Sequence, residues 1–433
     1  MNGDSEAQIG RKPFGVSAWI IVAALVLGLL AGMAANTLGP QSRGLAISIF
    51  GTLGGLWLDA LKMTVIPLVV ALLVKGIVGS AEIASEGRIA TLAIAWFLGL
   101  YFVSAAVGAI ATPLLLGLFP LPPAAEQAMR AGFAAVNPSE VQSSVAGLSD
   151  FVRSFIPSNP VAAASNGDML PIVVFTLFLA LALTVMEPSR RKPVVDFFRS
   201  LGDAMLVIIG WVLRVAAIGV FALAFVAGAA SGAAVFGAVI RFVLVYIAVG
   251  LVMIAIAYVV AVAASRFNLA AFSRAMAPTQ AIAFSTQSST GSLPVMLLSA
   301  RRLGVSMPTA DVVLPLAAAL FRVTGPAMNI AVVIFIADVL GLKLGVGPFV
   351  AGVAVATFAS ISAPGLPGQV SYFTSIAPIA MAMGVPIAPL GMLIAVEPVP
   401  DMFRTVGNVT MDVAVAGAVD RATTKKRRRS RAV

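Results

Sequence analysis

The chain has 433 residues, of which 60% are hydrophobic and 11% charged, with a mean hydropathy of +1.03 and a formal net charge of +10. Soluble globular proteins carry about 25% charged residues, so most of this chain is expected to lie in lipid and an ordinary soluble enzyme is excluded. The chain has neither cysteine nor histidine, which excludes disulfides, thiolate sites and histidine-based acid–base or metal chemistry.

The first apolar run extends from about Phe14 to Ala35 and follows Arg11 and Lys12. It is longer than the apolar region of a cleaved signal peptide and is close to the roughly 20 residues that a membrane span needs. We therefore predict the first transmembrane helix here.

Further apolar segments follow, and several exceed the roughly 20 residues of a span, so they are expected to tilt or to extend beyond the bilayer. These segments occupy residues 44–79, 89–119, 166–187, 194–229 and 234–265. The stretch from about 120 to 160 is instead polar and rich in Pro, Ser and Asn. It predicts a long loop.

Basic clusters set the predicted orientation. They lie at Arg11–Lys12, at 190–192, at Arg266 and Arg274, at 301–302, and in the tail 421–433, which holds seven basic residues and no acidic one. Cytoplasmic segments carry the excess of Lys and Arg, so both termini are predicted inside and the 120–160 loop outside. The tail is then a solvated end near anionic lipid headgroups, and we expect no nucleic-acid partner.

Two apolar segments in the C-terminal part are interrupted by polar residues, Gly and Pro. FSTQSSTGSLP interrupts residues 268–300, and SISAPGLPGQ interrupts residues 345–380. Membranes tolerate such backbone only where it lines a protein cavity, so each segment is predicted to be a re-entrant hairpin. One helix follows each hairpin, at about 306–337 and 386–420, and the repeated unit indicates an inverted repeat with a binding site between its halves. The alternative is two poorly hydrophobic spans.

The last predicted helix carries polar side chains on one face. At the helical step they fall within an arc of about 100°, and they are Glu397, Asp401, Arg404, Thr405, Asn408 and Asp412. Ionisable groups inside a membrane normally face a cavity or one another. Arg404 can bind a carboxylate through two hydrogen bonds, Asp401 can bind an ammonium group, and the neighbouring Thr405 and Asn408 can orient a second carboxylate. This polar stripe would suit an acidic amino acid.

The alternative is an ion-pair ladder without a ligand. Asp401 and Arg404, three residues apart, can pair on a helix, whereas Glu397 is too far from Arg404 for an ideal helical neighbour.

Five motifs point to a known family. They are LKMTVIPLVVALLVKGI in the second span, IGVFAL in the fifth, QSSTGSLP and SISAPGLPG at the two hairpin tips, and DMFRTVGNVTMD in the last helix. At these residues the chain resembles the glutamate/aspartate transporter family, the dicarboxylate/amino acid:cation symporters, and the resemblance covers essentially the whole chain.

The resemblance implies an all-α polytopic inner-membrane protein with eight transmembrane helices and two re-entrant hairpins. It implies a homotrimer in the lipid bilayer, whose transport domain moves like an elevator against a trimerising scaffold. For this chain we expect no cofactor and no metal site. The expected domain boundaries are residues 1–87 for scaffold helices 1 and 2, 88–120 for transport-domain helix 3, 121–229 for the outer loop and scaffold helices 4 and 5, 230–420 for the rest of the transport domain, and 421–433 for the tail.

By the same resemblance, Asp401 would bind the substrate amino group and Arg404 the side-chain carboxylate. Asn408 and Ser289 would meet the main carboxylate with Thr405 nearby, and the remaining substrate contacts at the hairpin tips are Ser288, Thr290, Gly365 and Leu366. The second hairpin would act as the outer gate. Because Asp401 and Arg404 are both present, glutamate or aspartate is the expected substrate. Glu397 stands where the family more often has Asp.

The chain departs from the family in the seventh helix, whose N-M-D-G-T signature holds sodium. The aligned residues here are Phe321-Arg322-Val323-Thr324-Gly325, and hydroxyl-bearing positions of the third helix align with Phe97, Leu100 and Tyr101. Hard cations need several oxygen ligands. Part of that site survives, in Asn408 and Asp412.

We therefore hypothesise that the Arg322 guanidinium, next to Thr324, replaces the bound cation and pairs with Asp412, which would make transport independent of sodium. The alternative is that Arg322 extends to water and a displaced sodium site persists, because Gly325 and Pro326 still break the helix.

The coupling is open at this stage. A proton on Glu397, Asp401 or Asp412 could drive uptake, because burial disfavours a charged carboxylate. Uncoupled exchange or facilitated diffusion is the other possibility.

Two other protein classes fit less well. A membrane enzyme would have to work without His, Cys or a recognisable Ser–Lys pair. A channel would not need a stripe shaped for an amino acid, although the family can conduct anions along its domain interface.

Overall fold

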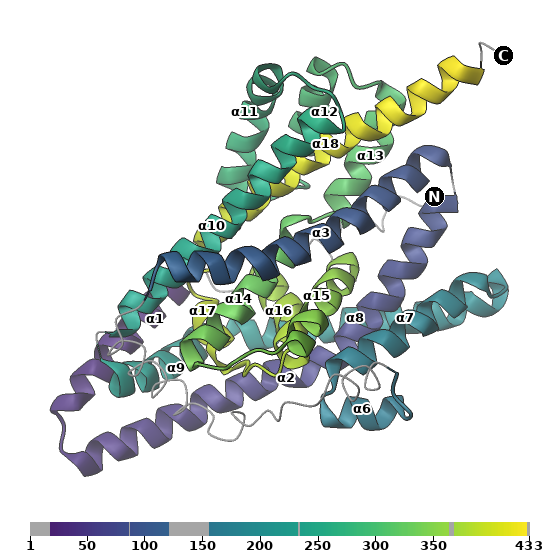
Figure 1. The fold of residues 1–433 in the computed structure, drawn as a ribbon. Coiled ribbons are helices and arrows are strands. Elements are labelled where there is room, and N and C mark those ends of the chain that lie inside the picture. The colour runs from purple at the N-terminus through teal and green to yellow at the C-terminus, as the bar shows by residue number, and fades with distance from the viewer. Residues whose placement is uncertain (1–17, 86, 121–155, 233, 363–367, 431–433) are drawn as a thin grey trace, which may run out of the picture.

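The fold is seen in a computed structural model that describes residues 18–85, 87–120, 156–232, 234–362 and 368–430. Within these ranges the regular structure is helical throughout, without strands (Figure 1). This confirms the predicted all-α class.

The first part of the chain forms α1 (Ala18–Ala34), the short 3-10 helix η1 (Ala35–Thr37), α2 (Pro40–Ser85), α3 (Arg88–Leu118), α6 (Pro160–Asn166), α7 (Met169–Val185), α8 (Pro188–Arg214) and α9 (Ala216–Ser231). The second part forms α10 (Ala234–Ala263), α11 (Leu269–Thr286), α12 (Leu293–Arg302), α13 (Met307–Leu320), α14 (Thr324–Leu340), α15 (Val346–Ser362), α16 (Gly368–Ala382), α17 (Ala388–Leu393) and α18 (Pro398–Ser430).

Among the described residues, five helices are long and apolar enough to cross a membrane, with α13 and α14 counted as one interrupted helix. A sixth results if α8 and α9, which meet at an angle of 61°, count together. Two further apolar helices, α7 and α15, are shorter. The chain is thus a helical multi-pass membrane protein.

Three predicted helices or segments are interrupted. The apolar segment 194–229 bends between α8 and α9, and the helix expected over 306–337 is broken at residues 321–323. The helix expected over 386–420 is wrong as a single element, because α17 ends at Leu393 and α18 begins only at Pro398. Proline lacks an N–H and has a fixed φ, so it is suited to the first position of a helix and not to its interior.

The helices form two packed groups. In one, α2 runs beside α7, α8 and α9, and α1 lies along α9. In the other, α18 packs against α10, α11 and α13, while α3 lies along α14 and α15 (Figure 1). In each of the pairs α11–α12 and α15–α16, the two helices pack against each other, as in a helical hairpin. The tip of the second pair, residues 363–367, lies outside the described residues.

Glycines bring α1 and α9 into backbone contact. A Cβ atom at Gly32 would lie 2.1 Å from the carbonyl oxygen of Phe225, and one at Gly28 would lie 2.5 Å from that of Phe221. From the other side, a Cβ at Gly228 would lie 2.4 Å from the oxygen of Leu29. Membrane helices gain stability by such close approach because lipid provides no hydrophobic force between them.

We expect Gly32→Ala to destabilise the protein by about 1–3 kcal/mol, because the added methyl group forces α1 away from α9. Gly55→Ala, at a helical site in α2 with nothing within 4 Å of the new Cβ, is the matched control and should be neutral or slightly stabilising. Thermal unfolding of both variants in detergent measures the difference. Equal melting temperatures would refute the tight contact.

Candidate functional site

The polar stripe lies on α18 and is enclosed by protein. Its six side chains are buried, with exposed fractions from 0% for Asp412 to 9% for Asp401; they are Glu397, Asp401, Arg404, Thr405, Asn408 and Asp412. The helices α3, α10, α11, α13 and α14 surround α18, which explains how so many polar groups are kept away from lipid. The stripe therefore faces the interior of the bundle, as its spacing predicted.

Arg404 is the centre of a buried cluster. Its Nε lies 3.7 Å from Asp401 Oδ1, and its Nη1 lies 3.7 Å from Glu397 Oε1. Its Nη2 donates hydrogen bonds to the Tyr246 hydroxyl of α10 and, at 3.2 Å, to Asn329 Oδ1 of α14. Two carboxylates thus share one guanidinium. Both ion pairs are longer than a hydrogen bond, and Glu397 Oε1 and Arg404 Nε have no hydrogen-bond partner.

The pair between Glu397 and Arg404 corrects the expectation that seven residues separate them too far. That expectation assumed one continuous helix. Because α18 begins at Pro398, Glu397 lies in the turn between α17 and α18. Its carbonyl accepts the Asp401 N–H at 3.0 Å, while its side chain does not follow the direction of a residue inside a helix. Asp401 and Arg404 pair three residues apart, as predicted.

The break between α13 and α14 is held by hydroxyl groups of α3. The Tyr101 hydroxyl donates to the Leu320 carbonyl at 2.5 Å and accepts from the Arg322 N–H at 2.9 Å. The Ser104 hydroxyl donates to the Val323 carbonyl and accepts from the Ala327 N–H. These bonds satisfy backbone groups that the interrupted helix leaves unpaired.

The other side of the break is held by α18. The backbone N–H and the hydroxyl of Thr324 both donate to Asn408 Oδ1, at 3.0 and 2.8 Å. The same hydroxyl lies 3.1 Å from the carbonyl oxygen of Arg404. Because a backbone N–H can only donate, the Asn408 oxygen must face Thr324, and its NH₂ group remains as a donor on the other side.

Aromatic rings fill the positions where the resemblance places sodium ligands. Phe97 of α3 stacks on Phe321, with ring centroids 4.3 Å apart and an interplanar angle of 14°. Tyr101 contacts the same ring at 5.4 Å. Phe97, Phe321 and Val323 are buried. Their side chains carry no oxygen that could hold a cation.

Arg322 lies in the break, but the predicted pair with Asp412 is not formed. Both carboxylate oxygens of Asp412 and Nε of Arg322 are buried without a hydrogen-bond partner. In the described part of the chain, Arg322 is the cation whose charge acts on Asp412, through space and without an ion-pair contact. The charges of Asp401 and Arg404 on α18 also act on Arg322, likewise through space and without an ion-pair contact.

The tip of the first hairpin lies near the start of α18. Ser289 is buried, Ser288 is half-buried and accepts a hydrogen bond from the Gly291 N–H, and Thr290 is exposed. The contact with α18 is made by Gln287, whose Nε2 donates to the Pro398 carbonyl at 3.1 Å. The tip of the second hairpin, with Gly365 and Leu366, lies outside the described residues. Thr405 directs its hydroxyl to the Asp401 carbonyl at 2.9 Å.

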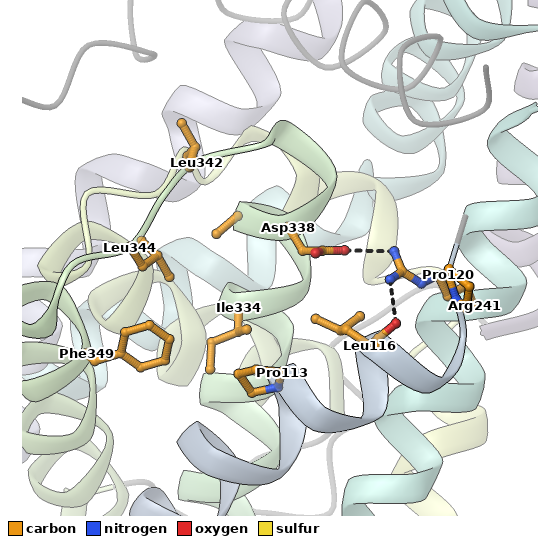
Figure 2. Close-up of a pocket in the computed structure, with 11 residues that line it drawn as sticks. Pro113, Leu116, Pro120, Arg241, Ile334, Asp338, Leu342, Leu344 and Phe349 are labelled. Carbon is orange, nitrogen blue, oxygen red and sulfur yellow. Dashed lines mark hydrogen bonds and ion pairs between the residues drawn. The ribbon is translucent and has the colours of Figure 1, made fainter. Parts of the chain in front are cut away.

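A separate pocket of about 450 Å³ lies between the ends of α3 and α14 and the start of α15 (Figure 2). No stripe residue lines it. Its one arginine, Arg241, already binds Asp338 at 2.7 Å and donates to the Leu116 carbonyl at 3.0 Å. The ion pair joins α10 to α14, and the hydrogen bond joins α10 to the end of α3, which explains the position of Arg241 without a ligand.

Comparison with known proteins agrees with this geometry. The model of the sodium:dicarboxylate symporter family matches residues 17–422. The chain belongs to the sodium:dicarboxylate symporter family. It is therefore a transporter-family protein and not an enzyme, which confirms the resemblance seen in the motifs.

Individual members of the sodium:dicarboxylate symporter family are distant from this chain. It is 28% identical over 399 residues to the proton/glutamate-aspartate symporter of Escherichia coli, covering 90% of this chain and 89% of that protein. It is 28% identical over 413 residues to the proton/sodium-glutamate symport protein of Bacillus subtilis, covering 94% and 92%. It is 24% identical over 417 residues to the C4-dicarboxylate transport protein of Rhizobium johnstonii, covering 94% and 90%.

Three residues that serve the site of this symporter-family chain were not predicted from the sequence: Tyr246, Asn329 and Gln287. Tyr246 and Asn329 are among the few polar side chains of two predominantly apolar helices, α10 and α14. Isolated polar residues in membrane helices usually face the protein interior, and that signal could have found them. Gln287 could not be predicted, since nothing in the sequence indicates which tip residue reaches α18.

We expect Tyr101→Phe to loosen the break, because it leaves the Arg322 N–H and the Leu320 carbonyl without a partner at a cost of about 1–3 kcal/mol. Hydrogen exchange of peptides that cover residues 318–328 measures this loosening. Tyr258→Phe, which removes a hydroxyl bonded to Gln280, is the control and should leave exchange in this segment unchanged. Equal exchange in Tyr101→Phe and the native protein would contradict the assigned role.

Proposed function

We propose that this member of the family is a secondary transporter of acidic amino acids, with L-aspartate or L-glutamate as substrate. The observation that carries the proposal is the buried pair of Asp401 and Arg404 on one face of α18. A charged pair inside a membrane bundle is costly and normally serves a ligand or a transport pathway. The names of the relatives, a proton/glutamate-aspartate symporter and a C4-dicarboxylate transport protein among them, agree with an anionic substrate.

The donors and acceptors match both ends of such a molecule. Arg404 would bind the side-chain carboxylate and Asp401 the ammonium group. Asn408 commits its oxygen to Thr324, so its NH₂ group would donate to the main carboxylate together with the hairpin tip around Ser289. A dicarboxylate without an ammonium group would leave Asp401 uncompensated, which favours the amino acid.

The architecture that goes with this function has eight transmembrane helices, two re-entrant hairpins related by inverted repeats, and a homotrimer in the inner membrane with both termini cytoplasmic. In the described ranges, six spans are long and apolar enough to cross a membrane when α8 and α9 count as one. Adding α7 and α18 gives eight transmembrane helices. The group around α2 would be the scaffold, and the group around α18, residues 88–120 and 230–420, would move as an elevator. The most extensive helix contacts lie within each group, such as α1–α9 and α2–α8 in one and α10–α18 and α3–α14 in the other, while α2 also packs against α3, α15 and α16 where the groups meet. This pattern supports the division.

Transport would be independent of sodium and driven by protons, with Arg322 in place of the bound cation. Support comes from the stacked Phe97 and Phe321 rings, which occupy space where ligand oxygens would be needed. Arg322 adds a fixed positive charge to the same region, and its charge acts on Asp412.

One observation favours a second candidate, a sodium-coupled symporter with rearranged ion sites. The two oxygens of Asp412 are buried and unpartnered, and a cation at a displaced position would satisfy them. An uncoupled exchanger of amino acids or dicarboxylates is the remaining alternative.

Uptake of labelled L-aspartate into proteoliposomes of the purified protein tests the proposal. Sodium and pH gradients are imposed separately. We expect uptake to follow an inward proton gradient, to be indifferent to sodium, and to be saturable and lost in Arg404→Ala. A strict requirement for sodium would establish the second candidate, and exchange without response to either gradient would establish the uncoupled carrier.

We expect Arg322→Met to lower proton-driven uptake at least tenfold, because Asp412 loses the positive charge of Arg322 that acts on it, and Arg322→Lys to retain a large part of the uptake. Arg274→Met, at an exposed position of α11, is the control for removal of a basic residue. The same proteoliposome assay measures all three. If Arg322→Met transports as well as the native protein, the guanidinium does not replace a cation.

A further inference from the structure

We propose that Glu397 is the carboxylate that the substrate displaces from Arg404, and that the displaced Glu397 takes up the coupled proton. This inference rests on the proposed proton-coupled transport of an acidic amino acid and assigns a positioning and coupling residue to it. It starts from the contacts of Glu397 in the substrate-free structure.

Arg404 compensates the negative charge of the buried Glu397 side chain. The side chain is 1% exposed, and Arg404, at 3.7 Å, is the only cation that pairs with it in the described part of the chain. No hydrogen bond reaches Oε1. A buried carboxylate without a cation or donors is strongly disfavoured and becomes neutral instead.

In the described part of the chain, no other group around Glu397 pairs with it as a cation. Tyr246 of α10 and Tyr372 of α16 are neutral hydroxyls, Asp401 carries the same charge as Glu397, and Arg322 acts only through space. Tyr246 already accepts a hydrogen bond from Arg404, and α17 brings no titratable group. If Arg404 is taken by a ligand, Glu397 therefore loses its partner.

A substrate carboxylate would take Arg404 in this way. Without substrate, Glu397, Asp401 and Arg404 sum to one negative charge, and Arg322 and Asp412 cancel. L-Aspartate adds two carboxylates and one ammonium group, so binding would raise the buried negative charge to two. One proton that passes from the surrounding water to Glu397 restores the original charge, and the neutral acid no longer needs Arg404.

The length of the Glu397 side chain suits this exchange. Its contact with Arg404 is an ion pair of 3.7 Å in which Oε1 makes no hydrogen bond, whereas a substrate carboxylate can form two hydrogen bonds to the guanidinium. The weaker internal pair is thus replaced by a stronger one. The backbone of Glu397 is fixed at the start of α18, where its carbonyl accepts the Asp401 N–H at 3.0 Å. The exchange therefore requires only rotation of the Glu397 side chain, whose Oε1 no hydrogen bond holds.

The test counts protons at binding. Calorimetric titration of the full-length protein with L-aspartate, in buffers of different ionisation enthalpy, gives the protons taken up per ligand. We expect about one for the native protein and for Asp311→Asn, an exposed acid on α13, and none for Glu397→Gln. We also expect the affinity of the native protein to fall up to tenfold per pH unit as Glu397 ionises, and that of Glu397→Gln to stay constant with pH.

Several outcomes would overturn the assignment. Proton uptake in Glu397→Gln equal to the native value places the proton elsewhere while leaving proton coupling intact. A folded Glu397→Gln that does not bind L-aspartate shows that the charged side chain is required, contrary to displacement. Binding without proton uptake in the native protein refutes proton coupling itself, and with it the role of Glu397.

A second variant, Glu397→Asp, tests the proposal even where Glu397→Gln does not fold. Glu397→Asp has a shorter arm and holds Arg404 less well, so its affinity for L-aspartate above neutral pH should exceed that of the native protein while proton uptake persists. An unchanged affinity at every pH would overturn the proposal.

Discussion

The interruption between α13 and α14 is the constraint on which the site depends. Residues 321–323 interrupt the helix in the interior of a membrane bundle, where an unpaired backbone group costs several kcal/mol. Tyr101 and Ser104 of α3 and Asn408 of α18 supply the missing partners. Their position requires α3, α14 and α18 to lie side by side, and a Cβ at Gly108 of α3 would already lie 2.4 Å from the Ala327 carbonyl. The break thus fixes the helices that carry the polar stripe.

Charge balance is the second organising element. Two guanidinium groups and three carboxylates share a region from which solvent is largely removed. Buried charges are tolerated when they compensate one another, even where the contacts are longer than hydrogen bonds. Arg404 is held by a tyrosine and an asparagine in addition to its two acids, so its position is defined before a ligand arrives. Such preorganisation reduces the cost of ordering a charged side chain at binding.

Much of this arrangement could be predicted from the sequence, because intramembrane polarity is a strong signal. The spacing of Asp401, Arg404, Asn408 and Asp412 indicated one buried helical face, and the α18 packing agrees. The reach of Glu397 could not be predicted, since it depends on where α17 ends and α18 begins. The absence of an ion pair between Arg322 and Asp412 likewise could not be predicted, because it depends on the path of the broken helix, which periodicity does not reveal. Tyr246 and Asn329 come from other helices, and only packing shows that they meet Arg404.

A positive charge that belongs to the chain behaves differently from a dissolved ion at the same place. Sodium enters with the substrate and leaves with it, so its gradient can do work on the cargo. In the proposed sodium-independent mechanism, the Arg322 guanidinium would be present both when the carrier is empty and when it is loaded. Its charge would lower the free-energy cost of burying the Asp412 carboxylate. It could not drive net transport of the substrate, because a group bound to the chain has no concentration gradient across the membrane. In that mechanism, the return of the empty carrier would need no prior release of a cation from this position.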